Sequence, residues 1–276
     1  MTVAPFSPLD PAVYREIVRR ALAEDVRWGD VATDATISAE LTPCVLAGVD
    51  VASECFRQLD PHVLTEAMLR DGVHCESGTE LLRIRGFASA LLTAERTALN
   101  FLQRMCAVAT RARTYVEAGG GRVTVLDTRE TTPTLRALET YAVRVGGGVN
   151  HRVGLDDGAR VERHHAELAG GITAAVARIR EADADLPIEV ETSTLVAVDE
   201  ALAVGASTVL VDGRSLTFVR EAVRRSRGRA KVEITGEVTP ARMAELSQTG
   251  AEYVSVSELT WCVPGIDIGL TLGGPV

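Results

Sequence analysis

The sequence predicts an α/β fold whose C-terminal part is a parallel sheet closed into a barrel. From about residue 116 to the end, apolar runs typical of buried strands alternate with helical patterns, as in repeated β/α units. The helical patterns are similar in length. The glycine run at 146–148 does not follow a strand in the way that a dinucleotide-binding Gly-x-Gly motif does. These observations favour a barrel over an open sheet.

Apolar runs give the strands of this part, and the stretches between them give its helices. From residue 188 onward the strands begin roughly every 20 residues, which leaves room for one helix in each connection. The expected strands are 123–128, 188–192, 208–212, 231–235 and 253–257, and the expected helices are 135–145, 195–204, 216–225 and 239–249.

The N-terminal part has a mixed pattern. An Asp-Pro pair opens each of two expected amphipathic helices, and a longer helical pattern follows short strand-like pieces interrupted by Gly78 and Gly86. The expected helices are 11–23, 59–71 and 93–112, and the strand pieces lie between 72 and 92. We therefore divide the chain into an N-terminal domain, 1–115, and a barrel domain, 116–276, with its active site at the strand C-termini.

Composition limits the partners that the chain can bind. A formal net charge of −9 argues against a nucleic-acid surface or an anionic-membrane surface. No stretch approaches the ~18 consecutive apolar residues of a membrane span, and the N-terminus lacks the pattern of a signal peptide. Scattered cysteines without a Cys-x-x-Cys pair are typical of reduced thiols, so we expect a cytoplasmic protein. Lys231 is the only lysine, so an anion site must rely on arginine, histidine or backbone N–H groups.

Charged residues gather where the expected strands end, which is where β/α barrels bind their ligands. Arg129 and the pair His151-Arg152 suit a carboxylate or a phosphate. Carboxylates follow almost every strand, namely Asp127, Glu130, Glu191, Asp212, Glu237 and Glu258. Each of them alone also fits a solvated loop or a helix cap. Glu162 and the pair His164-His165 form a candidate metal site. Against it, consecutive side chains of a strand point to opposite faces.

Three segments carry a resemblance to a known family. They are LLTAERTALNFLQRM at 91–105, LDTRETTPTLRALETYAVRVGGGVNHRVGLDDG at 126–158 and DIGL at 267–270. These segments closely resemble quinolinate phosphoribosyltransferase, also called carboxylating nicotinate-nucleotide pyrophosphorylase. The resemblance implies an N-terminal open-faced α/β sandwich and a C-terminal incomplete, seven-stranded α/β barrel of the type II phosphoribosyltransferase kind. It implies a homodimer with active sites at the subunit interface, to which helix 93–112 contributes.

The resemblance also implies a reaction and its residues. Quinolinate is joined to phosphoribosyl pyrophosphate, and carbon dioxide is then lost to give nicotinate mononucleotide. The family's quinolinate clamp is matched by Arg129, His151 and Arg152, together with Arg96, which the family supplies across the dimer. The remaining candidate substrate-binding residues are Arg144, Thr128, His165, Thr235, Gly236 and Ser257.

The acidic side of the site departs from the family. Glu191 and Asp212 match its acidic pair near the ribose and the metal-bound pyrophosphate. Glu130 and Glu162, however, stand where the family has lysines that hold phosphates, and Glu237 replaces a glycine of its phosphate loop. A unit charge pair at ~4 Å is worth about 4 kcal/mol at an effective dielectric of ~20, so two reversals weigh heavily against a diphosphate. Part of an N-terminal strand is also missing around Pro43-Cys44, so the sandwich should lack or shorten a strand.

We interpret this pattern as an enzyme that has kept the carboxylate clamp and lost phosphoribosyl pyrophosphate. In this leading hypothesis the chain binds a pyridine or other aromatic carboxylate and acts as a decarboxylase or another carboxylate-transforming enzyme of specialised metabolism. Its candidate catalytic residues, as acid/base groups or cation ligands, are Glu130, Glu162, Glu191 and Asp212. No cofactor is assigned and Mg²⁺ stays open; the candidate metal ligands are Glu162, His164, His165, Glu191 and Asp212.

Two alternatives stay open. The first is an authentic quinolinate phosphoribosyltransferase that makes nicotinate mononucleotide for NAD biosynthesis, with Arg163 and Arg214 compensating for the missing lysines. The second is a non-catalytic protein that binds a carboxylate.

Overall fold

The computed structural model describes residues 6–25, 43–152 and 154–272. The chain divides into two compact units. Unit 1 consists of three segments, which are the chain up to Arg113, Thr131–Gly147, and the chain from Glu258 onward. Unit 2 consists of Thr114–Glu130 and Gly148–Ser257. Both units are therefore discontinuous in sequence.

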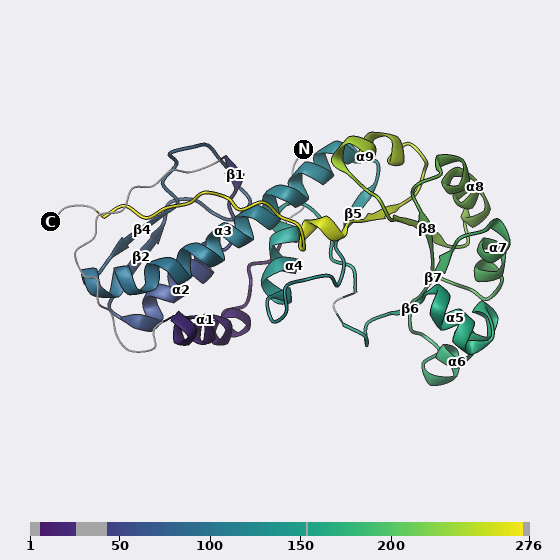
Figure 1. Ribbon diagram of the computed structural model, residues 1–276, viewed down its shortest axis with the longest axis horizontal. Coiled ribbons are helices and arrows are strands. Elements are labelled where there is room, and N and C mark those ends of the chain that lie inside the picture. Colours follow the sequence, from purple (N-terminus) through teal and green to yellow (C-terminus); the bar gives the residue numbers. More distant parts are fainter. Residues whose placement is uncertain (1–5, 26–42, 153, 273–276) are drawn as a thin grey trace. The chain divides into compact units, whose positions relative to one another are not determined.

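Unit 1 combines helices with two small antiparallel sheets (Figure 1). Its helices are α1 (Pro11–Asp25), α2 (Val49–Leu59), α4 (Arg136–Val145) and most of α3 (Ala88–Gly119), whose last residues belong to unit 2. Strand β1 (Cys44–Val45) pairs with β3 (His74–Cys75), and β2 (Leu64–Ala67) pairs with β4 (Leu82–Arg85). These helices on small sheets agree with the expected open-faced sandwich.

A glycine lets α2 and α3 approach closely. Gly48, which precedes α2, has a φ of 95°, a left-handed conformation that favours glycine. A Cβ added there would lie 2.6 Å from the Sδ atom of Met105 on α3. Its N–H donates a hydrogen bond of 2.8 Å to Asp71, which also accepts one of 2.7 Å from the Tyr141 hydroxyl. This contact ties α2, α3 and α4 into one core.

The predicted helix over 59–71 is wrong. Asp60 instead ends α2, where its N–H bonds to the carbonyl of Phe56 at 3.0 Å, and residues 64–67 form β2. The Asp-Pro pair at 60–61 therefore marks a helix end and the turn that follows. Helix α2 itself escaped prediction because it begins after a left-handed glycine without a side-chain cap. Around Pro43-Cys44, where a missing or shortened strand was expected, β1 is only two residues long, and the residues just before Pro43 lie outside the described ranges.

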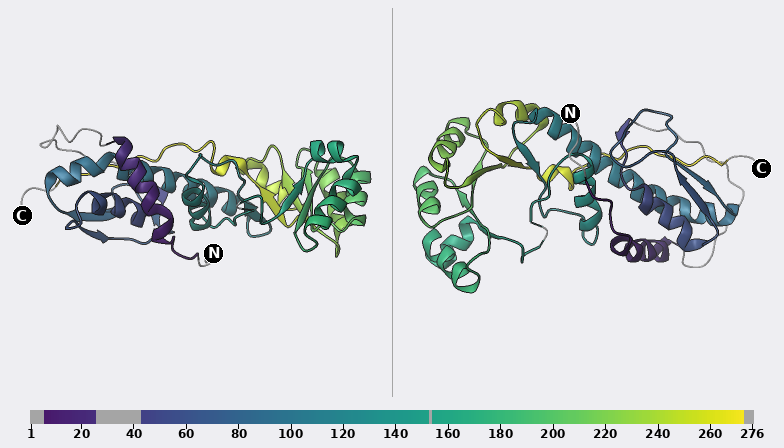
Figure 2. Two further views of the ribbon diagram at one scale, coloured as in Figure 1. Left: turned by 90° about the horizontal axis from the view of Figure 1, so that it is seen from below. Right: turned by 180° about the vertical axis from the view of Figure 1, so that it is seen from behind.

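Unit 2 is a curved parallel sheet with helices on its outer face (Figures 1 and 2). In the described residues the sheet has six strands in the order β5-β10-β9-β8-β7-β6. They are β5 (Thr124–Leu126), β6 (Ala159–Val161), β7 (Ile188–Thr192), β8 (Thr208–Asp212), β9 (Lys231–Thr235) and β10 (Tyr253–Ser255). The helices are α5 (Arg163–Ala169), α6 (Ile172–Ala182), α7 (Leu195–Ala203), α8 (Leu216–Ser226) and α9 (Pro240–Leu246), and the 3₁₀ turn Ser257–Leu259 follows β10.

The predicted α/β class, with an incomplete parallel barrel, is confirmed. Every pairing in the sheet is parallel, and β5 and β6 form its two edges. Beside β5, Val149 makes a single parallel bridge to Leu126, so a seventh strand is reduced to one bridge among the described residues. The strands expected at 188–192, 208–212 and 231–235 agree with β7, β8 and β9.

Other boundaries differ from the prediction. Helix α3 begins before and ends after the expected helix 93–112, and the edge strand β5 is shorter than the expected 123–128. β6, α5 and α6 were not predicted, because β6 consists of only three residues with Arg160 at its centre. In the described ranges, no helix combines the length and the apolar character that a membrane span needs.

Candidate active site

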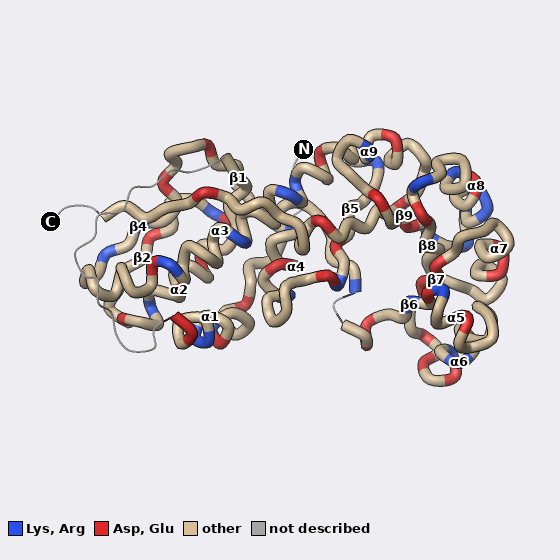
Figure 3. The backbone as a smooth tube through the Cα atoms, in the orientation of Figure 1, with Lys and Arg blue, Asp and Glu red and all other residues tan. Residues whose placement is uncertain are grey.

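Polar side chains of unit 2 meet at the carboxyl-terminal edge of its sheet, because parallel strands all end at the same edge. Figure 3 shows acidic residues along the inner side of this sheet, near β7, β8 and β9. We call this edge the rim. The candidate residues on it are Thr128, Arg129 and Glu130 after β5, Glu162 after β6, Glu191 in β7, Asp212 at the end of β8, Thr235 and Gly236 at the end of β9, and Ser257 after β10.

Several rim carboxylates are fixed by neighbours within unit 2. Glu130 accepts a hydrogen bond of 2.9 Å from the Ser257 hydroxyl, and its N–H donates to the hydroxyl of Thr128 at 3.2 Å. Asp212 accepts the N–H of Arg214 at 2.8 Å and pairs with that guanidinium at 3.6 Å. These bonds link β5 to β10 and hold the Asp212 carboxylate at the end of β8.

Gly236 brings the backbone of β9 close to the Asp212 carboxylate. Its φ is 98°, and a Cβ added there would lie 3.2 Å from Asp212 Oδ1. A side chain at this position would therefore be strained and would displace the carboxylate.

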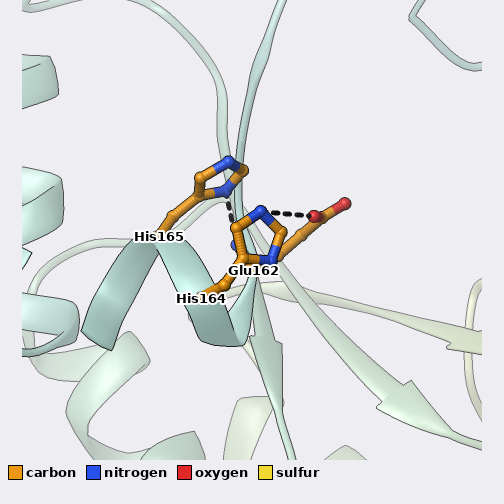
Figure 4. Close-up of side chains that lie close together, drawn as sticks. All are labelled: Glu162, His164 and His165. Atoms are coloured by element: carbon orange, nitrogen blue, oxygen red, sulfur yellow. Dashed lines mark hydrogen bonds and ion pairs between the residues drawn. The ribbon is translucent and has the colours of Figure 1, made fainter. Parts of the chain in front are cut away.

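Glu162 and the two histidines form a second group on the rim (Figure 4). The sequence placed the two histidines on a strand, but in the structure Glu162 is the N-cap of α5 and the histidines are in its first turn. The two imidazole rings are therefore side by side, with centroids 4.0 Å apart. His164 Nε2 lies 3.4 Å from the Glu162 carboxylate, and His165 Nδ1 accepts the Glu162 N–H at 3.2 Å. Glu191 is held nearby by the N–H of Arg163, at 3.2 Å.

A buried ionic cluster lies beneath the rim and includes His151. Its Nε2 atom is 3.1 Å from a Glu233 oxygen and 3.5 Å from a Glu189 oxygen. Arg160 contacts the same two carboxylates, Glu189 at 2.6 Å and Glu233 at 3.3 Å. The side chains of Glu189 and Glu233 are only 8% and 1% exposed, so two cations neutralise two anions away from water. We call these four residues the inner cluster.

The inner cluster shifts the pKa values of its members. Burial lowers the pKa of His151, but hydrogen bonds to Glu189 and Glu233 outweigh it and raise the pKa to about 9. Burial raises the pKa of Glu189, and the His151 and Arg160 cations reverse this and bring it to about 2. The pKa of Glu233, which is raised chiefly by burial, lies above its usual range. At neutral pH, His151 is therefore a cation and Glu189 an anion.

Asp127 positions the loop that carries His151. Its buried carboxylate accepts hydrogen bonds from the Asn150 side chain at 2.5 Å and from the His151 N–H at 2.7 Å. His151 Nδ1 in turn lies 2.7 Å from the backbone nitrogen of Arg152, so the protonation of this ring, which its raised pKa favours at neutral pH, requires that contact to lengthen. The Arg152 guanidinium donates to the carbonyl of Gly158 at 3.1 Å. A cavity of about 320 Å³ adjoins these residues and is also lined by Glu189 and Glu233.

The sequence alone did not identify Arg160, Glu189 and Glu233. A signal was present for the two glutamates, because each stands between two apolar residues of an expected strand, Ile188 and Val190 for Glu189, and Val232 and Ile234 for Glu233. A carboxylate inside a buried strand needs a buried cation, and this requirement would have directed the search to Arg160 and His151.

Two candidate residues, Arg96 and Arg144, belong to unit 1. Arg96 is an exposed residue of α3, and its neighbour Glu95 is buried. Arg144 lies near the C-terminal end of α4, where its guanidinium sits 5.7 Å from the centre of the Tyr141 ring.

A parallel, incomplete α/β barrel with arginine, histidine and carboxylates at its rim is typical of enzymes that act on anionic small molecules. Sequence models agree on the kind of enzyme. The model of the C-terminal domain of quinolinate phosphoribosyl transferase matches residues 108–271, and the model of its N-terminal domain matches residues 21–106. The chain belongs to the quinolinate phosphoribosyltransferase family.

Individual relatives match over nearly their whole length. The nicotinate-nucleotide pyrophosphorylase [carboxylating] of Mycobacterium leprae is 40% identical over 276 residues, which cover 94% of this chain and 96% of that protein. A probable nicotinate-nucleotide pyrophosphorylase [carboxylating] of Synechocystis is 34% identical, covering 98% and 96%. The crystal structure of NadC from Streptococcus pyogenes has a TM-score of 0.89 at 33% identity, covering 97% of this chain and 100% of that one. The nicotinate-nucleotide pyrophosphorylase of Francisella tularensis also has a TM-score of 0.89, at 31% identity, covering 96% and 97%.

These comparisons overturn the leading hypothesis from the sequence, in which the acidic rim excludes phosphoribosyl pyrophosphate. Full-length relatives are named for the pyrophosphorylase reaction, which favours the first alternative. Glu130 and Glu162 are not bare charges facing a phosphate. In the structure Glu130 is engaged by Ser257 and Glu162 lies beside His164, and water reaches these side chains and screens them. The electrostatic penalty was therefore overstated.

Proposed function

We propose that this chain is a quinolinate phosphoribosyltransferase that forms nicotinate mononucleotide, pyrophosphate and carbon dioxide from quinolinate and phosphoribosyl pyrophosphate. The proposal rests on His151, whose N–H donates to Asp127 at 2.7 Å and whose ring contacts Glu189 and Glu233, which raise its pKa to about 9. The reaction names of the full-length relatives support the same assignment.

The clamp binds and orients the dicarboxylate. Arg129 follows β5, and Arg152 lies in the loop that carries His151. Each offers a planar guanidinium that matches a carboxylate. The charged His151 ring adds a third cation beside them. Because the inner cluster fixes this ring, the substrate finds a site whose charge is already in place. In the family's dimeric arrangement the partner subunit's Arg96 completes the clamp, and this contribution is part of the proposal.

The reaction then proceeds in two steps. The quinolinate ring nitrogen attacks C1 of the ribose as the bond from C1 to pyrophosphate breaks, and pyrophosphate leaves with the electron pair. The ring nitrogen becomes a pyridinium and draws the electrons left at the adjacent ring carbon when its carboxylate departs as carbon dioxide. A proton then replaces the lost carboxylate at that carbon. Clamp residues hold the other carboxylate throughout.

The rim carboxylates serve the second substrate. Glu191 and Asp212 end neighbouring strands, and their oxygens are the donors that Mg²⁺ prefers, so they fit a magnesium ion that offsets pyrophosphate charge when bound. Gly236 leaves room for the backbone of β9 to approach the ligand beside Asp212.

Product formation tests the proposal directly. Purified protein is incubated with quinolinate, phosphoribosyl pyrophosphate and Mg²⁺, and nicotinate mononucleotide and carbon dioxide are quantified. We expect both products in equal amounts, with strong loss of activity in His151→Ala. His74→Ala is the matched control, because His74 is an exposed histidine beside a single carboxylate in unit 1. Absence of nicotinate mononucleotide at saturating substrates would refute the assignment.

A further inference from the structure

The rim of unit 2 is short of fixed positive charge on the side where a pyrophosphate is expected. The chain has a single lysine, Lys231, and it lies at the N-terminal end of β9, away from the rim. Glu130 follows β5 and Glu162 follows β6, the strands at the two opposite edges of the sheet, while Glu191 in β7 and Asp212 at the end of β8 lie between them. Arg163 and Arg214, whose side chains are 83% and 76% exposed, are the arginines beside these carboxylates, so a diphosphate placed here would gain from a further cation.

Glu162, His164 and His165, which we call the histidine cluster, offer ligand atoms for such a cation. One ligand atom from each residue lies within 4.8 Å of the others. Figure 4 shows the His164 ring turned towards the Glu162 carboxylate, with His165 behind it in the next position of α5. In a tetrahedral site with bonds of ~2.0–2.1 Å, ligand atoms are roughly 3.3 Å apart, so only the exposed side chains need to rotate. The 3.4 Å separation of His164 Nε2 and Glu162 already meets this spacing.

We propose that the histidine cluster binds a divalent transition-metal ion, of the Zn²⁺ or Co²⁺ kind, and that this ion provides the charge that faces the pyrophosphate. Two imidazoles and one carboxylate suit these ions better than Mg²⁺, which prefers oxygen ligands alone. The role at pyrophosphate rests on the proposed function, whereas the metal site itself does not.

The exposure of the histidine cluster leaves coordination positions open. The side chain of His164 is 61% exposed and that of Glu162 is 35% exposed, so water or a ligand oxygen can complete the coordination of an ion held there. Three protein ligands with an open position are typical of metal sites that contact substrate.

Two hydrogen bonds of the histidine cluster and its neighbour Arg163 show what a bound ion would adjoin and which contact it would change. Arg163 N–H holds the Glu191 carboxylate at 3.2 Å, so the histidine cluster adjoins the acidic pair on the rim. His165 Nδ1 accepts the Glu162 N–H at 3.2 Å, a long hydrogen bond in the capping box of α5. Coordination through Nδ1 replaces that bond, whereas coordination through Nε2 places a proton on Nδ1 and also removes its acceptor. Metal binding therefore has a structural signature at the N-cap of α5, a loss of protection of the Glu162 amide from hydrogen exchange.

Metal binding is measured first without substrates. The metal-free full-length chain is titrated with Co²⁺, and visible absorption reports imidazole coordination while calorimetry with Zn²⁺ gives stoichiometry and affinity. We expect one ion per chain, bound roughly 10–100-fold more weakly in His164→Ala and in His165→Ala. His62→Ala is the control, because His62 Nδ1 lies 3.1 Å from Asp60 as an exposed pair in unit 1. Equal Co²⁺ affinity in all four proteins would overturn the proposed site.

The role of the ion is measured by kinetics in Mg²⁺ buffer, with and without Zn²⁺. We expect Zn²⁺ to lower the KM for phosphoribosyl pyrophosphate roughly 10-fold and to leave the KM for quinolinate unchanged. The double variant Glu162→Lys/His164→Ala restores a fixed charge, so its KM should no longer respond to Zn²⁺. A KM that ignores Zn²⁺ in the natural chain would overturn the role while leaving the transferase assignment intact. Co²⁺ binding without any nicotinate mononucleotide would instead refute the assignment and retain the site.

Discussion

The inner cluster makes a strong prediction about Arg160. Arg160→Met keeps a side chain of similar length and removes the guanidinium that contacts Glu189 at 2.6 Å and Glu233 at 3.3 Å. Removal of one partner from a buried ion pair leaves an uncompensated charge, which typically costs ~3–5 kcal/mol. Because His151 still neutralises part of this charge, we expect a loss of about 2–3 kcal/mol in the free energy of unfolding at pH 7. That corresponds to a fall of roughly 4–10 °C in Tm.

The loss of unfolding free energy in Arg160→Met must depend on pH, and the pKa of Glu189 fixes the direction of that dependence. Burial and the neighbouring cations together bring the pKa of Glu189 from 4.5 to about 2. A carboxyl group with a depressed folded-state pKa stabilises the fold above its unfolded-state pKa, and this contribution disappears as the pH falls through the folded-state value. The difference between natural chain and Arg160→Met should therefore be largest at pH 7 and shrink between about pH 4.5 and pH 2.

Thermal and urea unfolding at pH 7 and at pH 3.5 measure this difference. Arg224→Met is the matched control, because Arg224 contacts Glu221 at the same 2.6 Å but its side chain is 70% exposed. Solvent screens that surface pair, so its removal should leave the transition nearly unchanged. A loss in Arg160→Met no larger than in the control, or one that is equal at both pH values, would refute the account of the inner cluster.

Three further predictions concern the proposed reaction. The Kd for quinolinate should stay flat from pH 7 to 8 and rise as the pH passes about 9, where His151 loses its charge; calorimetry showing a midpoint near 6.5 would contradict this. Asp127→Asn removes the anion that accepts the His151 N–H at 2.7 Å, so the KM for quinolinate should rise roughly 10-fold, with a stability loss of about 1–3 kcal/mol measurable in urea. Gly236→Ala introduces a Cβ 3.2 Å from Asp212 Oδ1 and should raise the KM for phosphoribosyl pyrophosphate, whereas Gly205→Ala, with a φ of 74° and no neighbour within 4 Å, should cost stability alone.

Much of the barrel was predictable because its central strands are buried on both faces. Residues 188–192, 208–212 and 231–235 are short segments rich in β-branched residues between helical patterns, and their limits agreed with the structure. The edge strand β6 was not predictable in this way, because its central residue Arg160 contacts charged side chains of the inner cluster instead of the apolar core. Arg160 there reads as a loop residue until its partners on β7 and β9 are known.

The candidate site was predictable as a set of rim residues but not as a charge balance. The sequence identified Arg129, His151 and Arg152, and it noted the acidic replacements at 130 and 162. It gave no account of what each carboxylate contacts, and the hypothesis built on bare charges was wrong. Contacts such as Glu130 with Ser257, which are 127 residues apart, depend on the strand order rather than on any local pattern.

The division of unit 1 into separate segments has a consequence for how the chain is made. The Gln103 side chain of α3 donates to the carbonyl of Ile268 at 2.7 Å, and Arg111 pairs with Glu258, so the first half of unit 1 needs residues from beyond unit 2. At ~5–20 residues per second, a ribosome takes roughly 5–20 s to pass through the intervening unit 2. Unit 1 can therefore complete its contacts only after all of unit 2 has been synthesised. The N-terminal half leaves the ribosome first and completes its contacts last.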